Sequence, residues 1–109
     1  MSAPITTPYL MHIEECRTCL QACYEVLEAT DATQACHRCL RDCANTLKMA
    51  IRLMEQQSPL ASRFLVDCAE VCEECARCSE KFDNPHARRM AAVCRNCVSC
   101  CRRGSAIDV

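Results

Sequence analysis

The chain has 109 residues, enough for one domain with a single core, and its formal net charge of −1 gives neither sign an excess. Acidic and basic residues are interleaved along it and aromatic residues make up only 4%, which disfavours a nucleic-acid-binding surface. A single glycine, with an abundance of alanine, leucine, glutamate, arginine and methionine, disfavours a β fold and favours helices.

Four helices are predicted from the signals at their ends. A capping residue precedes a proline at Thr7-Pro8, Ser58-Pro59 and Asn84-Pro85, and each pair is typical of a helix start. Asp31-Ala-Thr-Gln34 resembles a capping box and predicts the start of the second helix. Gly104 follows two arginines and is expected to end the last helix. These signals place the helices near residues 8–29, 32–56, 59–81 and 85–103.

The links between the predicted helices are short, so consecutive helices must run antiparallel. The predicted fold class is therefore all-α, an antiparallel four-helix bundle with a cysteine-lined core. It occupies residues 8–104, and we expect flexible termini at residues 1–7 and 105–109.

The fourteen cysteines are spaced like the buried residues of a bundle. Cys68, Cys72, Cys75 and Cys78 fall within an arc of roughly 120° on a helix that turns about 100° per residue. The first two helices share the pattern C-x-x-C-L-x-x-C, and the fourth carries C-x-x-C-x-x-C-C. Spacing of three and four residues is typical of the seam between packed helices. We predict that sulfur from all four helices lines the core, with the candidate metal ligands Cys16, Cys19, Cys23, Cys36, Cys39, Cys43, Cys68, Cys72, Cys75, Cys78, Cys94, Cys97, Cys100 and Cys101.

So many cysteines in a secreted chain would indicate a disulfide scaffold. However, residues 1–8 contain neither the basic start nor the apolar run of a signal peptide. No apolar run approaches the ~20 residues of a membrane span. We therefore expect a cytoplasmic protein with no membrane partner, whose thiols stay reduced, and this favours metal binding.

Disulfides and simple packing explain the cysteine pattern poorly. Thiols three or four residues apart on a helix have Cβ atoms about 5–6 Å apart, whereas a disulfide needs ~3.8 Å. Free cysteine also packs as a small apolar residue, but fourteen cysteines at or near inward positions are too many for that role alone. Cys100 is the clearest exception, because its neighbour Cys101 cannot share its direction.

Metal binding explains the pattern better, since soft thiolates select Cu(I), zinc or iron–sulfur clusters. Each pair on a straight helix offers two sulfurs, and a linear sulfur–metal–sulfur unit with bonds of the zinc length spans ~4.6 Å. Multiple Cu(I) ions suit this arrangement, and zinc is the alternative. Buried thiolates must be neutralised, which favours many ions that share ligands and a role in Cu(I) storage or buffering.

Two other functions stay open. A zinc or iron–sulfur protein would serve in regulation or electron transfer, and a structural module would respond to oxidants through its thiols. No nucleophile–base pair, phosphate loop or open catalytic metal site is apparent in the sequence, so we do not expect an enzyme.

The four cysteine-bearing helices, with Met-Glu-Gln-Gln-Ser-Pro at residues 54–59 between the second and third, resemble the bacterial copper storage proteins, most of all their cytosolic branch. The resemblance spans about Tyr9 to Arg103. It implies Cu(I) loading along the bundle axis and a homotetramer of bundles. Fuller members of the family carry more cysteines, and a reduced capacity is expected here because other residues occupy axial positions where sulfur could sit, namely Leu20, Leu27, Leu47 and Met90.

The resemblance also implies that copper enters at one end of the bundle, past histidine or methionine. His86 matches a histidine-bearing segment at the start of the fourth helix, and Met90 lies one turn further on, so both are candidates for this role. His12 is expected to be a boundary or core histidine at the end of the bundle away from His86, near Met54. His37 is next to Cys36 but does not lie on the cysteine-bearing face of its helix, so we expect it to be exposed to solvent.

Overall fold

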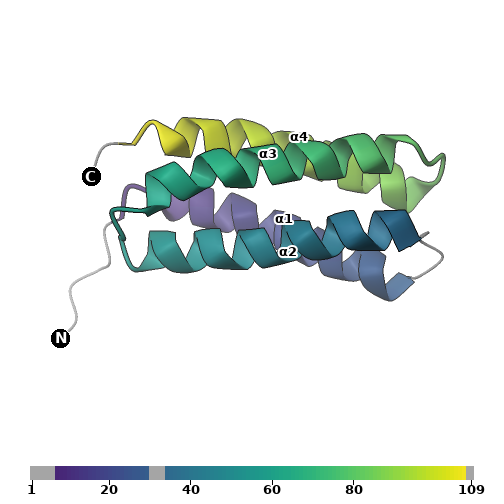
Figure 1. The fold of residues 1–109 in the computed structure, drawn as a ribbon, viewed down its shortest axis with the longest axis horizontal. Helices are drawn as coiled ribbons and strands as arrows, with labels where there is room; N and C mark the ends of the chain where they lie inside the picture. Colours follow the sequence, from purple (N-terminus) through teal and green to yellow (C-terminus); the bar gives the residue numbers. More distant parts are fainter. Residues whose placement is uncertain (1–6, 30–33, 108–109) are drawn as a thin grey trace.

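A computed structural model describes residues 7–29 and 34–107, without the side chains of residues 34–36. Its four helices are α1 (Leu10–Ala29), α2 (Gln34–Glu55), α3 (Ala61–Glu80) and α4 (Pro85–Ser105). They form an antiparallel bundle in which each helix packs against two neighbours, α1 and α3 both lying against α2 and α4 (Figure 1). The predicted fold class is confirmed.

The two ends of the bundle differ in which parts of the chain they hold. α1 and α3 begin, and α2 and α4 end, at what we call the terminal end, on the left of Figure 1. α1 and α3 end, and α2 and α4 begin, at the opposite end. Most of the predicted flexible termini lie outside the described residues, as does most of the predicted capping box at Asp31–Gln34. Those two predictions stay predictions.

The threonine–proline and serine–proline pairs sit one short turn before their helices. The Thr7 hydroxyl accepts a hydrogen bond from the N–H of Tyr9 (3.1 Å), and the Thr7 carbonyl accepts one from the N–H of Leu10 (3.3 Å). Ser58 repeats the hydroxyl contact with the N–H of Leu60 (3.1 Å). Because the hydroxyl makes a turn with its own backbone, the prolines stand in that turn and both helices start two residues later than predicted.

The start of α4 is confirmed as predicted. The Asn84 side chain accepts a hydrogen bond from the N–H of Ala87 (2.8 Å), and its backbone is extended (φ −148°). Pro85 is the first helical residue. An N–H at this position would have no acceptor within the helix, so proline costs no hydrogen bond there.

The predicted stop at Gly104 is wrong. α4 continues through Gly104 to Ser105, and no glycine has a positive φ. Gly104 is buried inside the helix, and a Cβ added there would lie 2.7 Å from Leu65 Cδ1 and 3.4 Å from His12 Cγ. The position therefore needs glycine because α1 and α3 side chains approach its backbone, not because the chain must turn.

Apolar side chains close both ends of the core. At the terminal end Tyr9, Met54 and Leu65 are fully buried, and at the opposite end Val26 and Leu40 are also buried. The middle of the core is made of cysteine. Of the residues predicted at axial positions, Leu47 and Met90 are buried, whereas Leu20 and Leu27 are half-buried and pack at the flank of the core.

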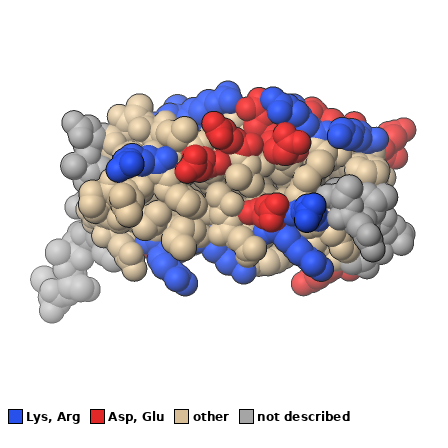
Figure 2. All heavy atoms as spheres, in the orientation of Figure 1, with Lys and Arg blue, Asp and Glu red and all other residues tan. Residues whose placement is uncertain are grey.

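The outer surface carries mixed charge, and Figure 2 shows acidic and basic side chains interleaved on one face. Ion pairs link neighbouring helices, as between Arg17 and Glu55 (2.6 Å) and between Arg102 and Glu73 (3.0 Å). Pairs of this exposed kind contribute at most about 1 kcal/mol each, so the core dominates stability.

In the described part of the chain, none of the helices combines the length and apolar character that crossing a membrane requires.

Candidate metal centre

The buried thiols lie on the inward faces of the helices, as the cysteine spacing predicts. Eleven of the described cysteines are buried free thiols, and they come from all four helices: Cys16, Cys19, Cys23, Cys43, Cys68, Cys72, Cys75, Cys94, Cys97, Cys100 and Cys101. Cys39 and Cys78 are half-buried. The side chain of Cys36 lies outside the described residues. Their shared role as ligands stays a prediction.

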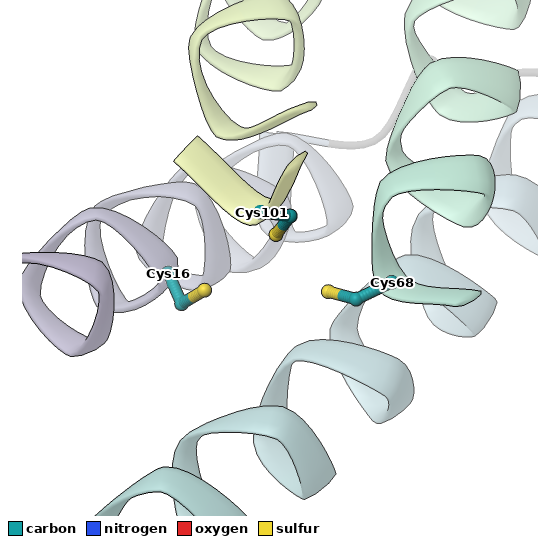
Figure 3. A group of neighbouring side chains, drawn as sticks. All are labelled: Cys16, Cys68 and Cys101. Atoms are coloured by element: carbon teal, nitrogen blue, oxygen red, sulfur yellow. The ribbon is translucent and has the colours of Figure 1, made fainter. Parts of the chain in front are cut away.

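Figure 3 shows one group of three sulfurs. Cys16 of α1, Cys68 of α3 and Cys101 of α4 point toward a common centre from three helices. Their Sγ atoms all lie within 4.8 Å of one another, and all three side chains are buried. A soft metal ion at the centre would meet three sulfurs and no water.

Three more groups of buried sulfur continue along the axis, each again within 4.8 Å: Cys19–Cys72–Cys97, Cys19–Cys23–Cys43 and Cys43–Cys75–Cys94. Cys19 and Cys43 each belong to two of these groups. A thiolate with two metal centres beside it can bridge them, so these groups are connected sites.

Close sulfur contacts join the groups into one column. Cys43 Sγ lies 3.7 Å from Cys72 Sγ, which lies 3.8 Å from Cys97 Sγ. Cys97 Sγ lies 3.9 Å from Cys101 Sγ, which brings in the group of Figure 3. The sulfur column therefore runs without a break through the middle of the bundle.

The number and spacing of the sulfurs in each group distinguish between the metals that the sequence suggests. A three-coordinate ion with bonds of about 2.3 Å holds its sulfurs ~4.0 Å apart, close to the 3.8 Å between Cys72 Sγ and Cys97 Sγ, which belong to one group. Zinc and iron–sulfur sites take four protein ligands. In the described part of the chain the candidate groups have three members, not four. The geometry favours Cu(I) over zinc or a cluster.

The sequence as a whole supports the same assignment, because residues 6–106 match the family model described as "Csp: Copper storage protein". The chain belongs to the copper storage protein family.

Individual relatives agree with this family. The chain is 31% identical over 96 residues to the uncharacterized cysteine-rich protein YhjQ of Bacillus subtilis strain 168, with 83% of this chain and 89% of YhjQ covered. It also resembles the solved structure of the Cu(I)-bound copper storage protein BsCsp3, at 30% identity and a TM-score of 0.80, covering 90% of this chain and 98% of the other. Apo-Csp3 from Bacillus subtilis matches with a TM-score of 0.81 at 30% identity, covering 90% and 99%.

Seven of the described thiols in this Csp-family chain have a raised pKa and so hold their protons tightly in the metal-free state. Hydrogen bonding with Cys101 and other neighbouring thiols, together with burial, raises the pKa of Cys97 well above its ordinary range. The pKa of Cys68 is raised by the same causes, and that of Cys94 by hydrogen bonding with Cys19 and by burial. The column is therefore largely neutral without metal and packs as apolar core.

A few thiols in the column ionise more readily. Hydrogen bonding with Cys23 and further thiols lowers the pKa of Cys19, and hydrogen bonding with Cys16 lowers the pKa of Cys101. A thiolate is already in the form that binds a metal ion, whereas a protonated thiol must first release its proton.

The residues predicted to guide copper into the bundle lie at the opposite end. His86 is exposed in the first turn of α4, and Met90 is buried one turn further on. At the same end Cys39 Sγ lies 2.7 Å from Cys78 Sγ, with both side chains half-buried. No candidate metal group among the described residues includes His86, so its role stays a prediction.

The other histidines differ in part from expectation. His37, predicted to be exposed, is half-buried, and its Nε2 is buried with no hydrogen-bond partner among the described residues. His12 is half-buried at the terminal end, as expected of a boundary residue. Its Nδ1 lies 3.0 Å from Cys100 Sγ, a pairing that we did not predict. The sequence contains one signal that His12 lies near the sulfur groups: it is four residues before Cys16, on the same face of the helix.

Proposed function

We propose that this Csp-family chain stores Cu(I) as many ions that share thiolate ligands along the bundle axis. The observation that carries the proposal is the sharing of Cys19 and of Cys43 between neighbouring three-sulfur groups. Isolated sites would keep their ligands separate, whereas a store gains capacity when each sulfur serves more than one ion.

Charge supports the same conclusion. An isolated Cu(I) held by two thiolates keeps one net negative charge, which is costly to bury. When thiolates bridge neighbouring ions, the ratio approaches one ion per sulfur and the column approaches neutrality. We therefore expect roughly ten or more ions per chain at saturation. Zinc is the less favoured alternative because the groups offer three sulfurs rather than four.

We do not assign a catalytic role. The sulfur groups are buried inside the bundle, where an organic substrate has no approach, and every ligand is of the kind that holds Cu(I) firmly. Storage or buffering accounts for the whole column, and a catalytic centre would account for one site at most.

The route, the compartment and the assembly belong to the proposal as well. Copper enters at the opposite end, where His86 is exposed and the half-buried Cys39 and Cys78 lead to the column. Met90, buried near the same end, provides a thioether along this path. We place the protein in the cytoplasm, where thiols stay reduced, and we expect a homotetramer because the family resemblance implies one.

An anaerobic Cu(I) titration of the fully reduced protein against a coloured competing chelator tests the proposal. Uptake of roughly ten or more ions per chain before the chelator colours is the expected result. Saturation at about three or four ions would indicate separate sites and revive the zinc alternative. A parallel titration with zinc measures that alternative directly. If the chelator takes all the copper from the start, the proposal is wrong.

A further inference from the structure

His12 and Cys100 form a contact that the sulfur column does not use. His12 Nδ1 of α1 lies 3.0 Å from Cys100 Sγ of α4, at the terminal end of the bundle. Cys100 is only 3% exposed, whereas His12 is half-buried. Among the residues that the structure describes, neither His12 nor Cys100 belongs to a three-sulfur group. The pair therefore places one nitrogen and one sulfur ligand beside the column, with the nitrogen on the solvent side.

The pair adjoins the group shown in Figure 3. His12 stands one helical turn before Cys16, and Cys100 is next to Cys101 in α4. A metal ion held by the pair would thus be one step from the first group of the column.

The axis itself is closed at this end, because the fully buried side chains of Tyr9, Met54 and Leu65 fill the core there. Access to the Figure 3 group from the terminal end must therefore pass sideways between two helices, and α1 and α4 are one such pair. That is where the half-buried imidazole of His12 stands.

Gly104 leaves the room that this imidazole occupies. A Cβ at position 104 would lie 3.4 Å from both Cγ and Nδ1 of His12, tighter than most side-chain contacts in proteins. Glycine in the last turn of α4 thus lets the ring lie against the helix backbone, with Nδ1 facing Cys100. The residues that form this site therefore all lie within two helices, α1 and α4.

We propose that His12 and Cys100 bind one Cu(I) ion between Nδ1 and Sγ, and that this mixed site is a second port through which copper exchanges with the column. The inference rests on the proposed storage function. Imidazole nitrogen and thiolate sulfur both suit Cu(I). The ion forms one bond to Nδ1 and one to Sγ, the S–H proton leaves to solvent, and no oxidation state changes. The bound unit is neutral, which suits a half-buried place.

Binding requires a small movement. Bonds of about 2.0 Å to nitrogen and 2.3 Å to sulfur, set in line, span ~4.3 Å, so the ring and the thiol must separate by about 1.3 Å. Cys100 is packed in the core, but His12 is half-buried and its ring can swing outward. A site that opens on one side is suited to exchange, whereas the closed groups of the column are suited to retention.

Nitrogen-15 NMR of the histidine rings tests the port without any substitution, since Cu(I) is diamagnetic. The reduced wild-type protein is titrated with Cu(I), and the ion count is followed in parallel by chelator competition. We expect the Nδ1 resonance of His12 to leave its metal-free position as copper loads. In Cys100→Ser the hydroxyl can still hydrogen-bond the imidazole but is a poor Cu(I) ligand. There we expect the Nδ1 shift to be lost and about one ion fewer to be bound. His37→Ala, at the other end of the bundle, is the matched histidine control and should load like the wild type.

The outcomes separate this inference from the storage function. Wild-type loading with an Nδ1 resonance that never moves would overturn the port and leave the store intact. A shift that persists unchanged in Cys100→Ser would show that Cys100 is not the partner ligand, and would also overturn it. A wild-type protein that retains no copper would instead overturn the storage function itself.

Discussion

Cys97 and Cys101, one turn apart on α4, hold their Sγ atoms 3.9 Å from each other. This contact is one link between the group at the terminal end and the rest of the column, since Cys101 belongs to the first group and Cys97 to the next. The column is continuous because one helix carries both thiols at helical spacing.

Replacing Cys97 with alanine should therefore lower the copper capacity. It removes one ligand from the Cys19–Cys72–Cys97 group and the contact between that group and Cys101, so we expect a loss of roughly one to two ions. The measurement is the saturated ion count in anaerobic chelator competition. Val98→Ala is the control, because Val98 is a buried neighbour on the same helix that carries no sulfur. An ion count in Cys97→Ala equal to that of the control would argue against the linked column.

Leu47 offers the reverse experiment. It is fully buried one turn from Cys43, on the side toward the terminal end. From this position in α2 we infer that its side chain lies beside the group of Cys16, Cys68 and Cys101, to which α2 contributes no cysteine. Leu47→Cys should add a fourth sulfur to that group and raise the ion count. The metal-free protein should lose about 2 kcal/mol of stability, because a large buried side chain becomes a small one.

Leu47→Ala is the control for this gain, since it loses similar packing without adding a thiol. Chemical denaturation of both metal-free variants measures the cost, and copper titration measures the capacity. Equal copper uptake by the cysteine and alanine variants would mean that position 47 does not face the column.

The stability of the reduced, metal-free protein should fall as the pH rises above about 9. Burial raises the pKa of Cys100 from 9.0 to about 11, and hydrogen bonding with neighbouring thiols and burial raise the pKa of Cys97 and of Cys68. In this range the unfolded chain has released these protons and the folded chain has kept them. Unfolding therefore releases protons, and the free energy of unfolding decreases with increasing pH.

Urea denaturation at about pH 8 and about pH 10 measures this dependence. Below the ordinary thiol pKa of 9.0 the contribution of the thiols with raised pKa is complete, and above it the midpoint should decline toward pH 11. The thiols with lowered pKa, such as Cys19 and Cys101, act in the opposite direction below pH 9 and add nothing to the decline above it. Copper-loaded protein should lack the decline if its thiols have already given up their protons. A metal-free midpoint that does not change over this range would contradict the raised pKa values.

Gly104→Ala should destabilise the protein, although alanine is normally the better helix former by about 1 kcal/mol. The new Cβ would meet Leu65 Cδ1 at 2.7 Å in a filled core. We expect a loss of about 1–3 kcal/mol in urea denaturation. Ser105→Ala, one residue on, should change stability by less than about 0.5 kcal/mol.

A second substitution checks the cause of that loss. Shortening Leu65 in the Gly104→Ala background removes the atom that clashes, so the double variant should cost less than the sum of its parts. Strict additivity would mean that the clash with Leu65 is not what destabilises Gly104→Ala.

Local chemistry determined the helices, and the sequence was sufficient to predict them. Asn84-Pro85 starts α4 as expected because an amide oxygen and a fixed φ act within one turn. Burial of the cysteines was also predictable, since thiols spaced three and four residues apart occupy one helical face. The shift of two residues at Thr7-Pro8 and Ser58-Pro59 was not, because a hydroxyl can cap a helix or make its own turn.

Only the tertiary structure decided which sulfurs meet. The membership of Cys19 and Cys43 in two sulfur groups each, the pairing of His12 with Cys100 and the close approach at Gly104 all involve residues from different helices. The periodicity of the sequence indicates which face of a helix is buried. It does not indicate the axial offset of one helix relative to the next, or the rotation of each helix about its axis. Those offsets come from the packing of side chains across the whole bundle, so the sequence by itself specified a thiol-lined core, and the packing specified the sites within it.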